Sequence, residues 1–129
     1  MPPQTPVGAI GVGTWAWGNS FLWGYEPSQD LALQQAFERC VALGLHFFDT
    51  ADSYGTGRFN GRSEMLLGRF CAALPAGQRR TLTVATKLAP FPWRLGRSGF
   101  RQALLASRMR LQGKLERVQL HWSTARYAP

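Results

Sequence analysis

Cysteine, histidine and lysine are scarce in this sequence, with two residues of each type. Cys40 and Cys71 are too few for the disulfide framework of a small secreted protein. Both lie on the apolar side of segments that we expect to be helices, where a free cysteine usually acts as a small buried hydrophobe. We therefore expect two free thiols and a reducing compartment.

Long apolar runs are also missing. No stretch reaches the roughly 18 apolar residues that a membrane-spanning helix needs, so we expect no membrane partner. The first residues, MPPQTPVGAIG, have neither the charged start and apolar stretch of a secretory signal nor the Arg- and Ser-rich character of a transit peptide. We expect a cytoplasmic protein, and a plastid location stays open because a transit peptide could lie upstream.

Acidic residues are few: seven stand against 15 basic ones, and the net charge is +8. The only lysines are Lys87 and Lys114, so the other 13 basic residues are arginines, and their longest run is the pair at residues 79–80. A nucleic-acid footprint would gather on one helix or face. We therefore expect no nucleic-acid partner, although a general basic surface favours anionic ligands.

The sequence has 45% hydrophobic residues, which is enough for residues 1–129 to form one globular domain or part of one. Strands are expected at residues 7–13, 45–49, 81–87 and 117–121, and helices at 28–43, 63–74 and 98–111. Ser28 and Ser98 are expected to cap two helices, and Gly44 and Gly113 to end two. This alternation predicts an α/β fold with a parallel sheet and right-handed crossovers.

Three ionisable residues, Asp49, Lys87 and His121, each close one of three successive expected strands. The carboxyl ends of parallel strands lie on one side of a sheet, and active sites form there. Each residue alone has a structural interpretation: a turn-forming aspartate, a lysine that reaches solvent, a histidine packed beside Trp122. Together on three successive strands they favour a functional site, whereas His46, early in its strand, is expected to be structural.

The glycine-rich run GAIGVG is superficially similar to a dinucleotide-binding fingerprint. Its spacing is not G-x-G-x-x-G, and a long loop rather than a helix follows it. We therefore reject a Rossmann fold.

Several motifs together resemble one known family. The run FFDTADSYG (residues 47–55), followed by Glu64 and then LLG, is similar to the signature of aldo-keto reductases. The segments ATK (residues 85–87) and QLHW (residues 119–122) match the next two motifs of that family in order and spacing, and GVGTWAWG is similar to its first strand. The stretch TKLAPFPWRLG further resembles chloroplast-type members from plants and algae. The resemblance implies a (β/α) TIM-type barrel, of which this chain would hold the N-terminal half, about four βα units.

The resemblance also implies roles for single residues in the reduction of an aldehyde or ketone to an alcohol. Tyr54 would be the general acid that protonates the carbonyl oxygen, and the nearby cation of Lys87 would stabilise the phenolate. Asp49 would pair with Lys87, and His121 would donate a hydrogen bond to the carbonyl oxygen. NADPH would be the cofactor, with Asp49 and Thr14 among its contacts.

Aromatic residues fall in the loops and strand ends of the same rim. They could form the wall of an apolar substrate pocket, and packing within the loops is the alternative. The residues are Trp15, Trp17, Phe91, Trp93 and Trp122.

A full barrel has eight strands and about 250 residues, whereas this chain ends eight residues after His121. In the family that it resembles, most of the NADPH site lies in the other half. Three hypotheses follow: an NADP(H)-dependent carbonyl reductase represented by part of its chain, a non-catalytic half-barrel that acts by self-association through its exposed sheet edges, and a basic nucleic-acid-binding module.

Overall fold

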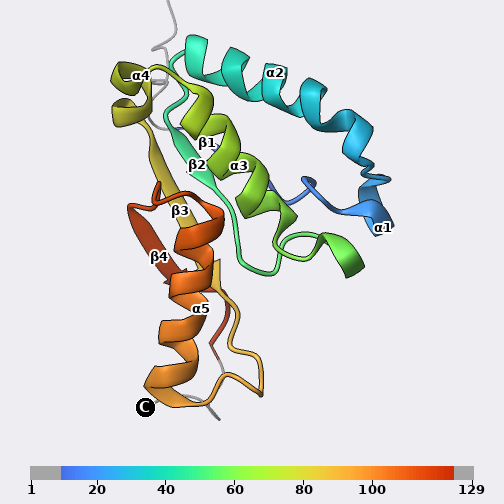
Figure 1. The fold of residues 1–129 in the computed structure, drawn as a ribbon, viewed down its shortest axis with the longest axis vertical. Coiled ribbons are helices and arrows are strands. Elements are labelled where there is room, and N and C mark those ends of the chain that lie inside the picture. The colour runs from blue at the N-terminus through green and yellow to red at the C-terminus, as the bar shows by residue number, and fades with distance from the viewer. Residues whose placement is uncertain (1–9, 124–129) are drawn as a thin grey trace, which may run out of the picture.

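The computed structural model describes residues 10–123, which form a four-stranded parallel sheet in the sequential order β1-β2-β3-β4 (Figure 1). The strands are β1 (Gly11–Gly13), β2 (Phe47–Asp49), β3 (Thr83–Leu88) and β4 (Arg117–Leu120). Each consecutive pair is parallel and joined by helical segments. This confirms the expected architecture of the first four units of a (β/α) barrel.

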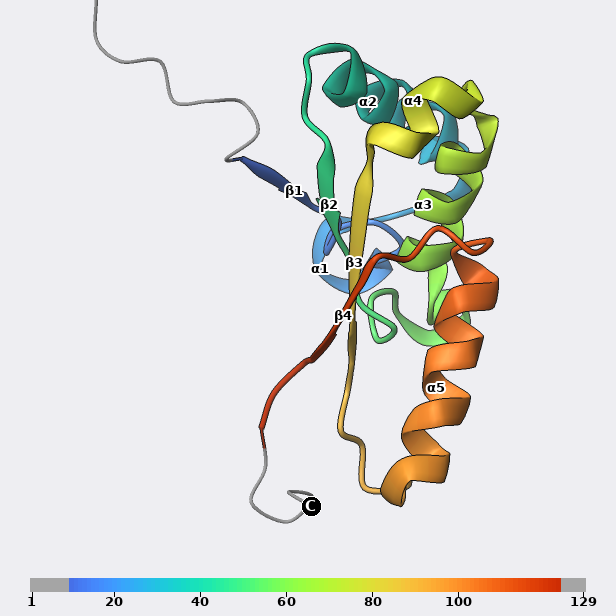
Figure 2. The ribbon, with the colours of Figure 1, turned by 90° about the vertical axis from the view of Figure 1, so that its left-hand side faces the viewer.

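Three long helices connect the strands, and shorter ones lie at their ends. They are α2 (Asp30–Ala42), α3 (Arg62–Ala73) and α5 (Gly96–Arg110), with α1 (Ser20–Trp23), α4 (Ala76–Thr81), η2 (Pro27–Gln29) and η3 (Gly57–Phe59) as short segments. Figure 2 shows α3 and α5 together on one side of the strands. The sheet therefore has a helix-covered outer face and an inner face that no helix covers among residues 10–123.

The element boundaries correct several expectations. Ser28 lies inside η2 rather than at a cap, and Ser98 is the third residue of α5. Thr81 belongs to α4 and not to a strand, because Pro75 starts a helical turn in which the Arg79 amide donates to the Pro75 carbonyl. The glycine expected to end α2, Gly44, does adopt a left-handed conformation (φ 85°). Residues 7–9 of the expected first strand lie outside the described residues.

The core lies between the outer face of the sheet and the helices. Phe48 of β2 is fully buried and packs on Phe37 of α2, with 4.9 Å between ring centroids; Phe37 in turn contacts Phe70 of α3 at 5.8 Å. Side chains alternate along a strand. Because Phe48 faces the helices, its neighbours Phe47 and Asp49 face the inner side, which places the ionisable residue of this strand away from the core.

Two buried polar clusters join the helices to the strand ends. Ser63 of α3 lies 2.7 Å from the Thr14 hydroxyl and 2.9 Å from the Thr50 hydroxyl. The enclosed carboxylate of Glu64 accepts hydrogen bonds from the Thr86 hydroxyl and from Arg110 Nε. Buried polar groups are costly unless they are paired, and here each has its partner. The clusters therefore fix α3 against β1, β2, β3 and α5.

The last strand is an open edge. All four residues of β4 are exposed, with Val118 at 42% and Leu120 at 54% of their full accessible surface. Among residues 10–123 no helix is long and apolar enough to cross a membrane. The same residues contain no group of three histidine, cysteine or carboxylate side chains that could hold a metal ion.

Candidate active site

The Lys87 ammonium group lies on the inner face of the sheet, near the carboxyl end of β3. Lys87 Nζ lies 2.5 Å from Asp49 Oδ2, 2.9 Å from the Thr50 carbonyl oxygen and 3.2 Å from the Tyr54 hydroxyl oxygen. An ammonium has three protons, and here each has one acceptor. The Tyr54 oxygen therefore accepts a hydrogen bond from Lys87, and its own proton is free to point elsewhere.

The loop after β2 holds Tyr54 in this position. This loop runs alongside β3. The Thr50 amide donates to the Ala85 carbonyl at 2.9 Å, and the Asp52 amide donates to the Lys87 carbonyl at 3.0 Å. It then turns sharply at Gly55, where φ is 112° and a Cβ atom would lie 1.9 Å from the Phe59 carbonyl oxygen. Only glycine fits there, so the glycine that follows Tyr54 in the sequence is required by the turn.

His121 completes the group from the end of β4. Its amide donates to the Leu88 carbonyl at 3.0 Å, and its ring meets the Tyr54 ring edge-on, with centroids 5.7 Å apart. Burial and the charge of Lys87 hold the pKa of His121 below its usual value, which favours the neutral imidazole. The structure thus brings together the four residues that the sequence singled out.

An ion pair beside the site was missed at the sequence level. The Asp52 carboxylate is fully enclosed; Arg94 Nη1 donates to it at 2.5 Å and to the Ala89 carbonyl at 2.7 Å. The Ala89 amide donates to the other Asp52 oxygen at 3.2 Å. This pair joins the loop after β2 to the loop after β3. The only sequence signal was the position of Asp52 two residues before Tyr54.

Three aromatic side chains gather around His121. Trp122 lies 5.1 Å from the His121 ring, Phe91 lies 5.9 Å from Trp122, and Trp93 stacks on Phe91 at 4.5 Å. Trp93 and Trp122 are 72% and 43% exposed, so they form an open apolar rim beside the imidazole. Trp15 is also exposed, but it packs edge-on against Trp23 and not against a residue of this group.

The side chains of two expected binding residues are buried. Trp17 is 8% exposed and packs on Phe70 in the core, so it does not form a pocket wall. Thr14 is fully buried, and its hydroxyl is engaged with the Asp49 carbonyl and Ser63. Its side chain therefore exposes no polar atom on the inner face of the sheet. Both residues follow β1 within a loop that folds back into the core, which the sequence pattern did not reveal.

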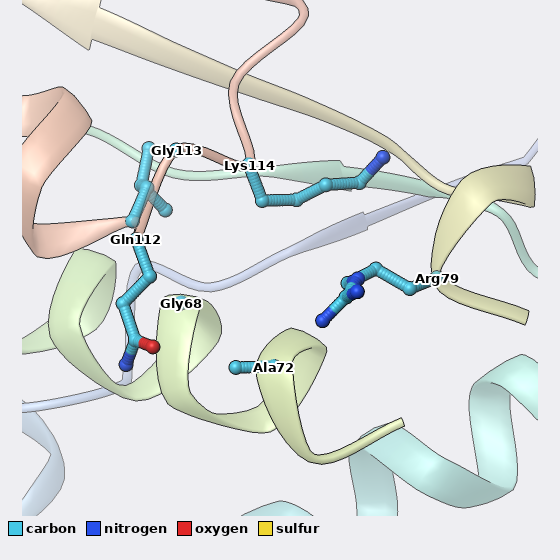
Figure 3. A pocket seen from close by; sticks show the side chains of 7 residues that line it. Gly68, Ala72, Arg79, Gln112, Gly113 and Lys114 are labelled. Atoms are coloured by element: carbon cyan, nitrogen blue, oxygen red, sulfur yellow. The ribbon is translucent and has the colours of Figure 1, made fainter. Parts of the chain in front are cut away.

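A separate cavity of about 350 Å³ lies at the opposite edge of the sheet. Figure 3 shows Arg79 and Lys114 on the same side of this cavity, with Gly68 and Ala72 of α3 also in its lining. Arg79 precedes β3 and Lys114 precedes β4, so the cavity is at the amino ends of the strands, and Lys114 is paired with Glu116 at 2.5 Å. It is not part of the group around Tyr54.

Comparisons with known proteins agree on one family. The model of the aldo/keto reductase family matches residues 9–127. The chain is 55% identical over 126 residues to the chloroplastic pyridoxal reductase of Arabidopsis thaliana, which covers 95% of this chain and 34% of that protein. It is 41% identical over 91 residues to an uncharacterized oxidoreductase of Mycobacterium tuberculosis, which covers 67% of this chain and 25% of that protein.

A solved structure shares the fold. It is the aldo-keto reductase of the silkworm Bombyx mori complexed with NADPH, with a TM-score of 0.65 and 23% identity over 88% of this chain and 32% of that chain. The chain thus spans about a third or less of the length of these relatives. With the family model matched over nearly all of its residues, this chain belongs to the aldo/keto reductase family.

Proposed function

We propose that this chain carries the acid–base residues of an NADPH-dependent reductase of aldehydes or ketones, with Tyr54 as the general acid. The observation that carries the proposal is the set of hydrogen bonds made by the Lys87 ammonium. It donates its three protons to Asp49 Oδ2, the Thr50 carbonyl oxygen and the Tyr54 hydroxyl oxygen. The Tyr54 proton is left to be donated to a carbonyl oxygen that lies against the inner face. General acid catalysis of this kind contributes roughly 100- to 10,000-fold to a rate.

The neighbouring charges suit the step that follows proton donation. When Tyr54 has given up its proton, the phenolate is stabilised by the ammonium 3.2 Å away. Asp49 holds that ammonium in place, with 2.5 Å between Lys87 Nζ and Asp49 Oδ2. His121, neutral and edge-on to the Tyr54 ring, would donate a hydrogen bond to the same carbonyl oxygen and orient it.

The inner face has room for the nicotinamide end of the cofactor. Gly13 of β1 pairs in register with Asp49, and a Cβ atom built on Gly13 would meet nothing within 4 Å. The Asp49 side chain is 31% exposed, so its carboxylate can accept hydrogen bonds from a ribose or amide group. The nicotinamide would supply the hydride. The Thr14 side chain is fully buried, so Asp49 is the cofactor contact that we retain in this proposal.

The 55% identity with a pyridoxal reductase favours an aromatic aldehyde of the pyridoxal type as the substrate. The open aromatic rim of Phe91, Trp93 and Trp122 beside His121 is suited to stack such a ring. The chloroplastic name of that relative favours a plastid location over the cytoplasm. Immunodetection of the endogenous protein in isolated plastids and in the cytosolic fraction tests this location, and a signal confined to the cytosolic fraction would contradict it.

The test begins with a titration of the purified chain with NADPH, followed by the quenching of its five tryptophans. Loss of NADPH absorbance with pyridoxal as substrate then measures reduction. We expect Tyr54→Phe to leave the quenching unchanged and to lower the rate roughly 100-fold or more. Tyr25→Phe is the matched control, because it removes the same atom from a hydroxyl that is bound to Asp30 and Arg62 instead. A Tyr54→Phe variant as active as wild type would overturn the proposal, as would a folded chain that reduces nothing.

The exposure of β4 supports a second candidate, association of two copies through this edge. Unpaired strand edges readily accept another strand. Gel filtration with light scattering tests this candidate. A concentration-independent monomer would exclude it, whereas a dimer that Val118→Lys or Leu120→Lys dissociates would support it.

A further inference from the structure

We propose that Ser53 is a positioning residue, whose hydroxyl donates a hydrogen bond to His121 Nδ1 and so places the imidazole proton on Nε2. The two atoms lie 3.2 Å apart, although the residues are 68 positions apart in the chain. The purpose of this contact rests on the proposed function, since Nε2–H is the group that would donate to a carbonyl oxygen. The tautomer itself does not depend on that function.

The proposed direction of the hydrogen bond is compatible with the partners of the serine hydroxyl, and the tautomer measurement below decides it. Among residues 10–123, the Ser53 hydroxyl has no side-chain or main-chain hydrogen bond other than the one with His121 Nδ1. Its proton is therefore available for the ring nitrogen. A neutral imidazole carries one proton, and a nitrogen that accepts a hydrogen bond leaves that proton on the other nitrogen.

The second histidine of the chain provides an internal contrast. His46 Nδ1 also faces a hydroxyl, Thr81 Oγ1, at 3.0 Å. Here the hydroxyl proton is already donated to the Gln78 carbonyl at 2.7 Å. Thr81 can then only accept, so the proton of His46 must lie on Nδ1. Two similar contacts thus predict opposite tautomers for the two histidines of one chain.

The surroundings of His121 favour the neutral ring that this arrangement needs. An imidazolium would carry a proton on Nδ1 and would oppose donation from Ser53. Burial and the nearby ammonium of Lys87 disfavour that charge, whereas the carboxylates of Asp49 and Asp52 act in the opposite direction and are weaker. The main-chain bond to Leu88 and the edge-on contact with Tyr54 hold the ring in place.

Long-range ¹H–¹⁵N correlation spectra of the ¹⁵N-labelled chain test the inference without cofactor or substrate. At a pH where both rings are neutral, we expect His121 with its proton on Nε2 and His46 with its proton on Nδ1. Ser53→Ala should move the His121 nitrogen shifts toward the averaged values of exchanging tautomers and leave His46 unchanged. Ser53→Thr, which keeps the hydroxyl, should restore them. Thr81→Ala is the matched control and should change His46 alone.

A His121 proton on Nδ1 in the wild-type chain, or shifts that Ser53→Ala does not change, would overturn the inference. Where reduction is measurable, Ser53→Ala should lower kcat about tenfold, by analogy with the lower end of what metal-bound histidines lose with the partner of their second ring nitrogen. Ser53→Thr should recover the rate. If the spectra agree with the inference and the chain reduces no carbonyl, the failure lies with the proposed function and not with the role of Ser53.

Discussion

Gly68 of α3 lies directly against the main chain at the end of α5. A Cβ atom built on Gly68 would lie 2.4 Å from the Arg110 carbonyl oxygen and 2.7 Å from Leu111 Cα. Both of these atoms belong to the main chain at the end of α5, so no side-chain rotation relieves the clash. We therefore predict that Gly68→Ala forces the two helices apart.

The magnitude follows from two opposing effects. The closest contact falls about 1 Å short of the 3.4 Å at which ordinary contacts begin. Overpacking of this kind costs about 1–3 kcal/mol, and a rigid main-chain neighbour places Gly68 near the upper end. Replacing glycine by alanine within a helix returns up to about 1 kcal/mol. We expect a net loss of about 2 kcal/mol in the free energy of unfolding, with the Arg110–Glu64 ion pair at the same crossing disturbed as well.

Gly77 in α4 offers the matched control, because a Cβ atom there meets nothing within 4 Å. Gly77→Ala should keep only the favourable helical effect and raise the free energy of unfolding by up to about 1 kcal/mol. Urea unfolding followed by tryptophan fluorescence measures both variants. If Gly68→Ala is as stable as wild type, or if both variants shift in the same direction by the same amount, the packing argument is wrong.

Three further predictions concern single side chains. Arg94→Ala leaves the enclosed Asp52 carboxylate without its cation and should cost about 3 kcal/mol in urea unfolding; adding Asp52→Asn should recover part of this, and no recovery would contradict the mechanism. The pKa of His121, followed by its ring protons in NMR, should lie below about 6.5. Between the pKa of His121 in the folded state and its higher pKa in the unfolded state, the unfolded state binds more protons. The contribution of His121 to stability is therefore complete above about pH 6.5 and is lost as the pH falls through the folded-state pKa. A folded-state pKa above the usual value would refute this direction of the pH dependence. Burial raises the pKa of Cys71 to about 12, so iodoacetamide at about pH 8 should label Cys40 and spare Cys71 until urea unfolds the chain; equal labelling, seen by mass spectrometry, would count against this burial.

The order of the helices and strands was predictable because it depends on short-range sequence patterns. The parallel order of the strands then made it predictable that the site residues lie close together. The alternation of apolar runs with helical spacing located all four strands, and the parallel connection then placed Asp49, Lys87 and His121 at one edge. Tyr54 could be assigned only through the family resemblance. It lies in a loop, and no periodicity places a loop residue against Lys87.

The burial of individual side chains in the loop after β1 was not predictable in the same way. Trp15 and Trp17 are two positions apart and chemically identical, yet one is 52% exposed and the other 8%. The difference depends on contacts with Phe70, far along the chain, and on the hydroxyl cluster of Thr14 and Ser63. Composition gives no signal for such long-range packing. The Asp52–Arg94 pair was missed for the same reason, since its two residues are 42 positions apart.

Among residues 10–123, the contacts that hold Tyr54, Lys87 and His121 come from the four strands and the loops that follow them. Lys87 is held from β2 and its loop, and His121 is held by a β3 carbonyl and by Ser53. None of these contacts needs the outer edge of β4, which stays exposed. Further strands against that edge would add enclosure and binding energy for remote parts of a cofactor, and binding energy of that kind supports rate as well as affinity. Under the proposed function, cofactor affinity, and not the arrangement of Tyr54, Lys87 and His121, is expected to limit what residues 10–123 do alone. A chain that binds NADPH weakly should therefore still show a large effect of Tyr54→Phe once NADPH is in excess.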